Sequence, residues 1–302
     1  MNENTNKPLG FGEILDQTFR IIKTRFKTLF MITFLIMVPV LAIQALILSL
    51  SGRSFFTSVE SGQNILDQLI SGADAVSTTT IQEDLLTILA NFFLIIAMPL
   101  IAGAIIWTVK VTRESETIPV TKDMIKRALS RYWPMFWSTL LWCLILVGLL
   151  VPVFMVIGFS AISFVLNPIF GAILMFLLSI GAFIGIGLLM TRWSLYLPVV
   201  LFEQAAPGLS KSWQLTKRQT WKFFGLIIIL SIITGIVTAI LQLPLIFLGN
   251  SVLFHLLNNI ISLITSIVLF VGYAVMYFDS TTRQEATDLK EMISEYQVTD
   301  PS

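Results

Sequence analysis

The chain has 302 residues, of which 56% are hydrophobic and 12% charged, and its mean hydropathy is +0.86. Soluble proteins carry about 25% charged residues, so this composition excludes an ordinary water-soluble domain and indicates a helical membrane protein. Because the polar segments between the apolar runs are too short to form a core, we expect residues 1–302 to form a single membrane domain. Cys143 is the only cysteine, which excludes a disulfide framework and a thiolate metal site.

The first third of the chain is predicted to contain two membrane spans. Between residues 11 and 27 apolar residues recur every three or four positions and charged residues fill most of the other face, which indicates an amphipathic helix on the membrane surface. The uncharged run at about 28–50 is long enough to cross the bilayer and too long for a cleaved signal peptide. An acidic loop is expected at 51–84, with a short helix near 62–70, before a second span at about 85–109.

The middle third repeats this arrangement. Residues 110–133 contain six Lys or Arg residues and end in an aromatic cluster, as expected for a basic, amphipathic segment at the membrane surface, which we call an elbow. No charged residue occurs from 134 to 191, a length that holds two spans. We therefore expect spans at about 135–158 and 169–191, joined as a hairpin that turns near Asn167.

The last third contains a third elbow and a third hairpin. Residues 203–222 form the elbow, and the 56 residues that follow contain no Asp, Glu, Lys or Arg. This length again holds two spans, at about 223–248 and 256–278, with a short polar turn at 249–251. A polar tail is expected at 279–302.

The distribution of basic residues predicts the orientation. With six spans, 18 of the 19 Lys and Arg residues lie on the side of both termini, and only Arg53 lies on the other side. By the positive-inside rule both termini are expected to be cytoplasmic and the loop at 51–84 extracytoplasmic. The predicted fold is all-α, with six transmembrane helices arranged as three hairpins, each preceded by a cytoplasmic elbow helix. The residues expected at the membrane interface are Arg20, Lys23, Lys27, Arg127, Arg131, Trp133, Lys217, Arg218 and Lys222.

The third elbow carries a resemblance to known proteins. From Arg192 the chain reads R-W-S-L-Y-L-P-V-V-L-F-E, and further on L-S-K-S-W-Q-L-T-K-R-Q-T-W, ending at Trp221. Together with L-G-F-G-E-I-L-D-Q-T-F-R-I-I-K near the start and Y-F-D-S-T-T-R-Q-E-A-T-D-L near the end, this resembles bacterial integral membrane families related to the membrane domain of glycerophosphoryl diester phosphodiesterases. The positions that match the family's pattern are Arg192, Pro198, Glu203, Ser212, Leu215, Thr216 and Trp221.

The resemblance has limits that bear on function. It leaves residues 51–120 uncovered, and the chain departs from the family's closing motif because Asp279 is followed by Ser280 and Arg283 is displaced. In the family, phosphodiesterase activity belongs to a separate soluble barrel, and no segment of this chain encodes one. The resemblance therefore implies a bacterial cytoplasmic membrane protein but not the enzyme activity.

The predicted spans show no arrangement that indicates chemistry. They contain no Asp, Glu, Lys or Arg, so we expect no catalytic residue, no bound cofactor and no metal site. Arg192 and Glu203 are expected to form an interfacial ion pair with a structural role, in preference to substrate binding. The polar residues within or bordering the spans are expected to hydrogen-bond between helices, and they are Gln44, Asn91, Gln242, Asn258 and Asn259.

These observations lead to two functional hypotheses. The favoured one is a non-catalytic accessory or regulatory component in envelope or lipid homeostasis, whose partners are anionic lipid headgroups and a membrane or cytoplasmic protein. The alternative is a permease, flippase or export component for an apolar or amphipathic molecule, because four spans contain a proline that can break a helix around a cavity. We do not expect nucleic-acid binding, because the basic residues are spread over elbows that are predicted to lie on the membrane surface. The oligomeric state is left open.

Overall fold

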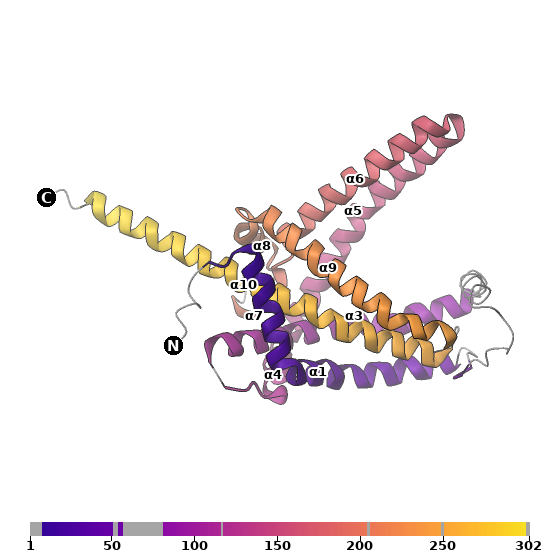
Figure 1. Cartoon of the computed structure of the whole chain (residues 1–302), viewed down its shortest axis with the longest axis horizontal. Coiled ribbons are helices and arrows are strands. Elements are labelled where there is room, and N and C mark those ends of the chain that lie inside the picture. Colours follow the sequence, from indigo (N-terminus) through magenta and orange to yellow (C-terminus); the bar gives the residue numbers. More distant parts are fainter. Residues whose placement is uncertain are drawn as a thin grey trace. The chain divides into compact units, whose positions relative to one another are not determined.

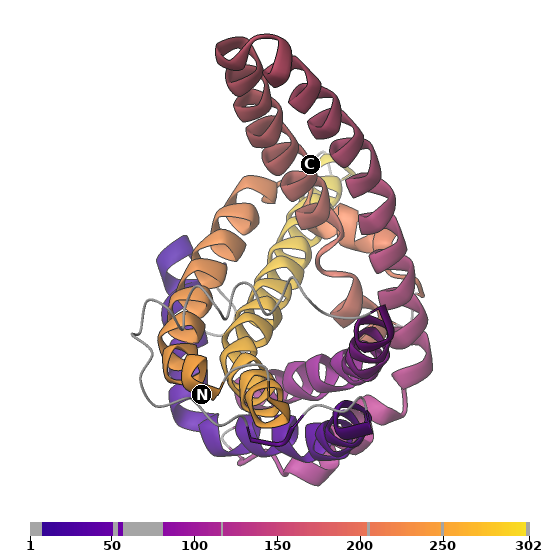
Figure 2. The same cartoon turned by 90° about the vertical axis from the view of Figure 1, so that its right-hand side faces the viewer.

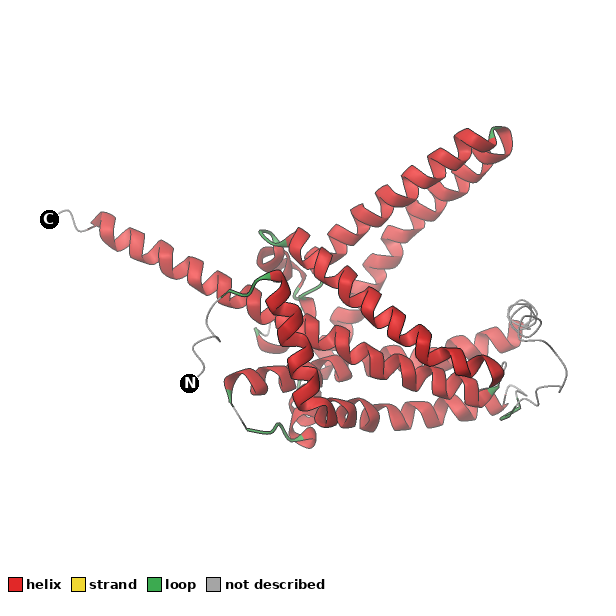
Figure 3. Ribbon diagram, viewed as in Figure 1, coloured by secondary structure: helices red, strands yellow, loops and turns green. Residues whose placement is uncertain are grey.

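The chain is all-helical in the parts that the structure describes. The computed structural model describes residues 8–50, 54–56, 81–115, 117–203, 206–248 and 251–299, and every regular element within them is a helix (Figure 3). Six of these helices are long and apolar enough to cross a membrane. The predicted all-α class and multi-pass character are thus confirmed. The short helix predicted near 62–70 lies outside the described residues.

Several helices are longer than a bilayer requires. At about 1.5 Å per residue, the 40 residues of α1 extend about 60 Å, against roughly 30 Å for the hydrocarbon core. Arg25 interrupts α1 with non-helical backbone angles (φ −119°, ψ 17°), close to the predicted boundary between surface helix and span. The helices labelled in Figure 1 are α1 (Phe11–Leu50), α3 (Ile81–Glu114), α4 (Thr121–Leu129), α5 (Tyr132–Leu166), α6 (Pro168–Trp193), α7 (Tyr196–Phe202), α8 (Leu209–Thr216), α9 (Thr220–Gln242) and α10 (Val252–Thr299). The 3₁₀ helix η2 (Leu243–Leu248) follows α9.

The chain forms two compact units. The first unit consists of Met1–Ile14, Arg131–Ile227 and Val275–Ser302, and the second consists of Leu15–Ser130 and Ile228–Ala274. Helices α1, α9 and α10 contribute to both units. Each unit is described separately below.

The second unit is held together by apolar packing and by hydrogen bonds between helices. Gln44 of α1, which is 1% exposed, accepts a hydrogen bond from Asn259 of α10 at 2.9 Å. Gln242 donates to Asn258 at 2.6 Å, so the interhelical role expected for these four residues is confirmed. The side chain of Asn91 lies outside the described part of the chain. In a bilayer such pairs contribute about 0.6 kcal/mol each.

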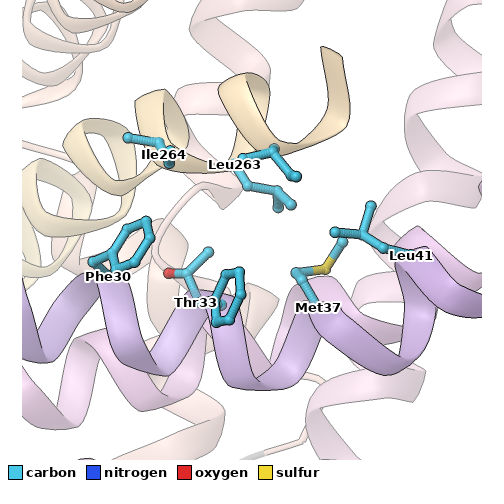
Figure 4. A pocket seen from close by; sticks show the side chains of 8 residues that line it. Phe30, Thr33, Met37, Leu41, Leu263 and Ile264 are labelled. Atoms are coloured by element: carbon cyan, nitrogen blue, oxygen red, sulfur yellow. The ribbon is translucent and has the colours of Figure 1, made fainter. Parts of the chain in front are cut away.

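A small apolar pocket lies between α1 and α10 in the second unit. In Figure 4 the side chains of Phe30, Thr33, Met37 and Leu41 face those of Leu263 and Ile264. Its volume is about 10 Å³, roughly the space for a single water molecule. This pocket is therefore far too small for a lipid chain.

The first unit is built on the pair α5 and α6. The two helices pack against each other, and Figure 2 shows them side by side along their length. Asn167 joins them and caps α6, because its side chain accepts a hydrogen bond from the backbone N–H of Phe170 at 3.2 Å, and Pro168 occupies the first turn. Large apolar side chains such as Phe154 and Phe176 are 67% and 65% exposed, as expected for a lipid-facing surface.

Two short helices complete the first unit near the end of α6. α7 packs on α5 and α8, and α8 packs on α6. Nearly all of α7 is buried, including Pro198, so this segment is covered by protein rather than by lipid or water. The apolar run after Arg192 thus forms a separate buried helix.

Candidate functional site

A cavity lined mainly by basic residues lies in the first unit. Its volume is about 380 Å³. Five of its nine lining residues are Lys or Arg, and we call it the basic cavity. Its lining comes from the end of α6, the start of α9 with the turn before it, and α10, and consists of Leu188, Arg192, Lys217, Arg218, Gln219, Thr220, Trp221, Lys222 and Arg283.

The end of α6 is fixed by two hydroxyl groups of α8. Ser212 Oγ donates to the backbone carbonyl of Arg192 at 2.9 Å. Thr216 Oγ1 lies 3.1 Å from the same oxygen and 2.9 Å from the carbonyl of Ser212, so these two acceptors share its one hydrogen. Both hydroxyl side chains are fully buried. Because the last carbonyl groups of a helix lack intrahelical partners, these bonds satisfy the end of α6 and hold Arg192 at the cavity.

The side chain of Arg192 is oriented by an aromatic ring. Its guanidinium carbon lies 4.5 Å from the centre of the Trp213 ring, a cation–π contact worth about 0.5–1 kcal/mol at an exposed site. The predicted ion pair between Arg192 and Glu203 is not formed. Glu203 instead pairs with Lys211 at 3.9 Å and accepts a hydrogen bond from Tyr277 at 3.4 Å. The prediction failed because the break after α6 separates the two residues by a buried helix.

A buried carboxylate fixes the opposite wall of the cavity. The Asp279 side chain is 0% exposed, and its oxygens accept hydrogen bonds from Lys222 Nζ at 2.9 Å, Arg283 Nε at 3.0 Å and the backbone N–H of Leu9 at 2.7 Å. The carbonyl of Leu9 accepts from Lys222 at 2.7 Å and from Arg283 at 2.6 Å. We call these four residues the Asp279 node. It joins the N-terminal segment, α9 and α10 within the first unit.

The cavity carries a large excess of positive charge. Five cations line it, and Asp279 pairs with two of them, Lys222 and Arg283. The cations thus outnumber the carboxylate of these ion pairs around a volume of about 380 Å³. Lys217 and Arg218 are exposed, and neither has an ion pair with a described side chain. The cavity is therefore suited to bind an anion.

The predicted site residues separate into two groups. Arg192, Trp221, Lys217, Arg218 and Lys222 line the basic cavity. Of the others, Ser212 donates a hydrogen bond to the backbone of Arg192. Pro198 is buried in α7, and Glu203 follows the end of that helix. Trp133 and Arg131 lie at the start of α5, outside the cavity lining, and Arg127 stacks on the Trp107 ring at 5.1 Å in the second unit, which also contains Arg20, Lys23 and Lys27.

Sequence reasoning missed the Asp279 node. Asp279 and Arg283 were discounted because they depart from the family's closing motif. A signal was present, since an Asp and an Arg four residues apart on a helix lie on one face and attract each other. The part played by Leu9 had no such signal, because it acts through its backbone.

The described residues include side chains of the types that bind metal ions. Among them, no three His, Cys, Asp or Glu side chains are grouped so as to hold a metal ion. Comparisons with protein-family models, with curated proteins and with solved structures find no match for this chain. The family resemblance at Arg192–Trp221 stays a prediction.

Proposed function

We propose that this chain is a non-catalytic protein of the bacterial cytoplasmic membrane that acts as an accessory or regulatory component in envelope or lipid homeostasis, with both termini in the cytoplasm. The observation that carries the proposal is the basic cavity, which lies where three apolar helices meet their polar flanks. A surface that is selectively cationic and concave is fit to sense or hold an anionic partner at the membrane.

The positions of the cavity residues along the chain support a place at headgroup depth. Arg192 is the first charged residue after the apolar run of α6, and Lys222 is the last before the apolar run of α9. Asp279 and Arg283 follow the apolar run of α10. Because each apolar run is long enough to cross the bilayer, residues at these ends belong to one membrane surface, and the positive-inside rule assigns that surface to the cytoplasm.

The alternative of a permease or flippase draws support from the prolines inside α1, α3 and α5. A route for an amphipathic molecule, however, needs space comparable to a ligand pocket, about 300–1,000 Å³. The apolar pocket between α1 and α10 has about 10 Å³. The accessory role is favoured because the larger cavity is polar and lies at the ends of the helices.

The test combines a phenotype with a flux measurement. In a strain that lacks the gene, we expect altered lipid composition or altered sensitivity to envelope stress, restored by the wild-type chain but not by a membrane-inserted R192Q/R218Q variant. In liposomes that contain the purified chain, we expect transbilayer movement of a fluorescent phospholipid at the protein-free rate. Movement that is accelerated by the wild-type chain and blocked in a cavity variant would reject the accessory role in favour of transport.

A further inference from the structure

We propose that the basic cavity is a binding site for the phosphate group of one anionic phospholipid. The proposal names a ligand for the function proposed above and rests on it only in taking the apolar helices to lie in a bilayer.

The first step is electrostatic. Arg192, Lys222 and Arg283 are held in place by Trp213 and by the Asp279 node, so these cations cannot simply move apart. Like charges that share a small volume repel one another, and a bound anion relieves this repulsion. The buried carboxylate of Asp279 accepts hydrogen bonds from Lys222 and Arg283, so its negative charge is used by these two cations and not by the others.

The second step concerns the chemistry of the donors. The Arg192 guanidinium carbon lies 4.5 Å from the centre of the Trp213 ring, and the guanidinium carries five N–H donors, which gives it donors for an anion beside this contact. Arginine donors match two oxygens of a phosphate at once, which makes this pairing stronger than one between neutral groups. Arg218 and Lys217 are exposed at the same cavity and supply further donors.

The third step concerns two further groups that favour an anion, the N-terminal end of α9 and the side-chain amide of Gln219. Thr220 to Lys222 form the start of α9, a helix of 23 residues whose N-terminal end carries a partial positive charge, and Gln219 is the last residue of the turn before it. Gln219 lines the cavity, and its buried Oε1 has no hydrogen-bond partner among the described residues. Because the oxygen and nitrogen of a side-chain amide are assigned from their surroundings, the reversed orientation directs an N–H₂ donor to this position.

The fourth step selects a lipid as the source of the phosphate. The cavity wall includes Leu188 and Trp221, and Trp221 is 69% exposed. Leu188 lies one turn before Arg192 on α6, towards the apolar part of that helix, and the exposed side chains Ile184 and Leu177 follow on the same helix face. Acyl chains thus find an apolar surface that continues from the cavity. A volume of about 380 Å³ also exceeds that of a single phosphate ion and suits a headgroup.

The experiment is native mass spectrometry of the full-length chain in mild detergent, because the mass of the adduct identifies what is bound. Dioctanoyl-phosphatidylglycerol, dioctanoyl-phosphatidylcholine and inorganic phosphate are titrated separately and as an equimolar mixture. We expect one phosphatidylglycerol per chain at saturation, with phosphatidylcholine and inorganic phosphate at least tenfold weaker.

Two variants and a matched control locate the site. K217Q/R218Q removes two exposed cations from the cavity, and R192Q removes the stacked cation while keeping the backbone carbonyl that Ser212 and Thr216 engage. Each is expected to weaken phosphatidylglycerol binding at least tenfold. K122Q/K126Q removes two exposed cations from α4 and is expected to leave binding unchanged.

Three outcomes overturn the proposal. Equal binding of phosphatidylcholine shows that the negative charge is not recognised, and equal binding of inorganic phosphate assigns the cavity to a soluble anion. An equal loss in K122Q/K126Q shows that overall charge, rather than the cavity, attracts the lipid. If the chain binds the lipid but a strain that lacks the gene has an unchanged envelope, the binding site stands and only the proposed function is rejected.

Discussion

At the scale of single residues, the buried carboxylate of Asp279 depends on several partners at once. Its carboxylate is fully buried and is stabilised by two cations and one backbone N–H. Removing one partner from a buried ion pair is strongly destabilising because it leaves uncompensated charge, and the loss is about 3–5 kcal/mol. The two cations here are partly exposed, so the lower end of this range applies.

We therefore expect Asp279→Asn to lower the free energy of unfolding by about 3 kcal/mol. The measurement is the midpoint of unfolding of the purified chain in detergent, by denaturant or heat. Glu285→Gln is the matched control, because Glu285 is exposed on the same helix and forms no salt bridge with a described side chain. If both variants lose the same stability, Asp279 does not have the stabilising role assigned to it.

The carbonyl of Arg192 allows a second test at this scale. Ser212 donates to it, and the hydroxyl of Thr216 is shared between this carbonyl and that of Ser212. When Ser212 loses its hydroxyl, Thr216 can turn its hydrogen to the Arg192 carbonyl, so either hydroxyl satisfies the acceptor when the other is removed. Ser212→Ala and Thr216→Val are each expected to cost about 1 kcal/mol, and the double variant more than the sum, because a buried acceptor left without a donor carries a further penalty. Additive losses in this double-mutant cycle would contradict a shared role at the end of α6.

At the scale of helices, hydropathy predicted where the helices lie in the sequence but not which of them pack together. The runs of uncharged residues predicted six apolar helices, and the Asn167–Pro168 sequence has the residue types that start a helix, as observed at α6. Hydropathy reports the solvent around a helix but not its neighbours, since lipid tails and leucine side chains are equally apolar. The convergence of α6, α9 and α10 at the basic cavity was therefore not predictable, although most of its cations were named as interface residues.

The polar pairs of the second unit provide a test of helix pairing. Gln44 and Asn259 are bonded at 2.9 Å between α1 and α10. In a double-mutant cycle with Gln44→Leu and Asn259→Leu we expect a coupling of about 0.6 kcal/mol, the average for such bonds in a bilayer. Ser49→Ala with Asn259→Leu is the control cycle, because Ser49 is exposed and bonds to its own helix, so its coupling should be zero. Equal couplings in the two cycles would show that the bond does not hold the helices together.

At the scale of the whole molecule, the six apolar helices place consecutive polar segments on alternating sides of a membrane. The structure supports a multi-pass protein, and the identity of each side stays a prediction from charge. The family resemblance likewise stays a prediction, from the third elbow and the motifs near both ends of the chain. Helix geometry does not determine the orientation, because a helix crosses a bilayer equally well in both directions.

Cysteine labelling tests the orientation. In a Cys143→Ser background, single cysteines at Lys122 and Lys217 are expected to react with a membrane-impermeant maleimide only after the cytoplasmic membrane is opened. A cysteine at Ser54, which lies beyond the end of α1, is expected to react in intact spheroplasts. Labelling of Lys122→Cys or Lys217→Cys from outside would reverse the topology and remove the basic cavity from the cytoplasmic surface.

The backbone bonds of Leu9 also constrain when the first unit can mature. Leu9 leaves the ribosome 270 residues ahead of Asp279, its acceptor. At about 5–20 residues per second, translation separates the two by roughly 15–50 s. Until α10 is synthesised, Lys222 has neither the carboxylate nor the settled N-terminal segment that will enclose it. A nascent chain that stalls before α10 thus lacks both partners of Lys222, and the first unit can close around this lysine only after the last helix has been made.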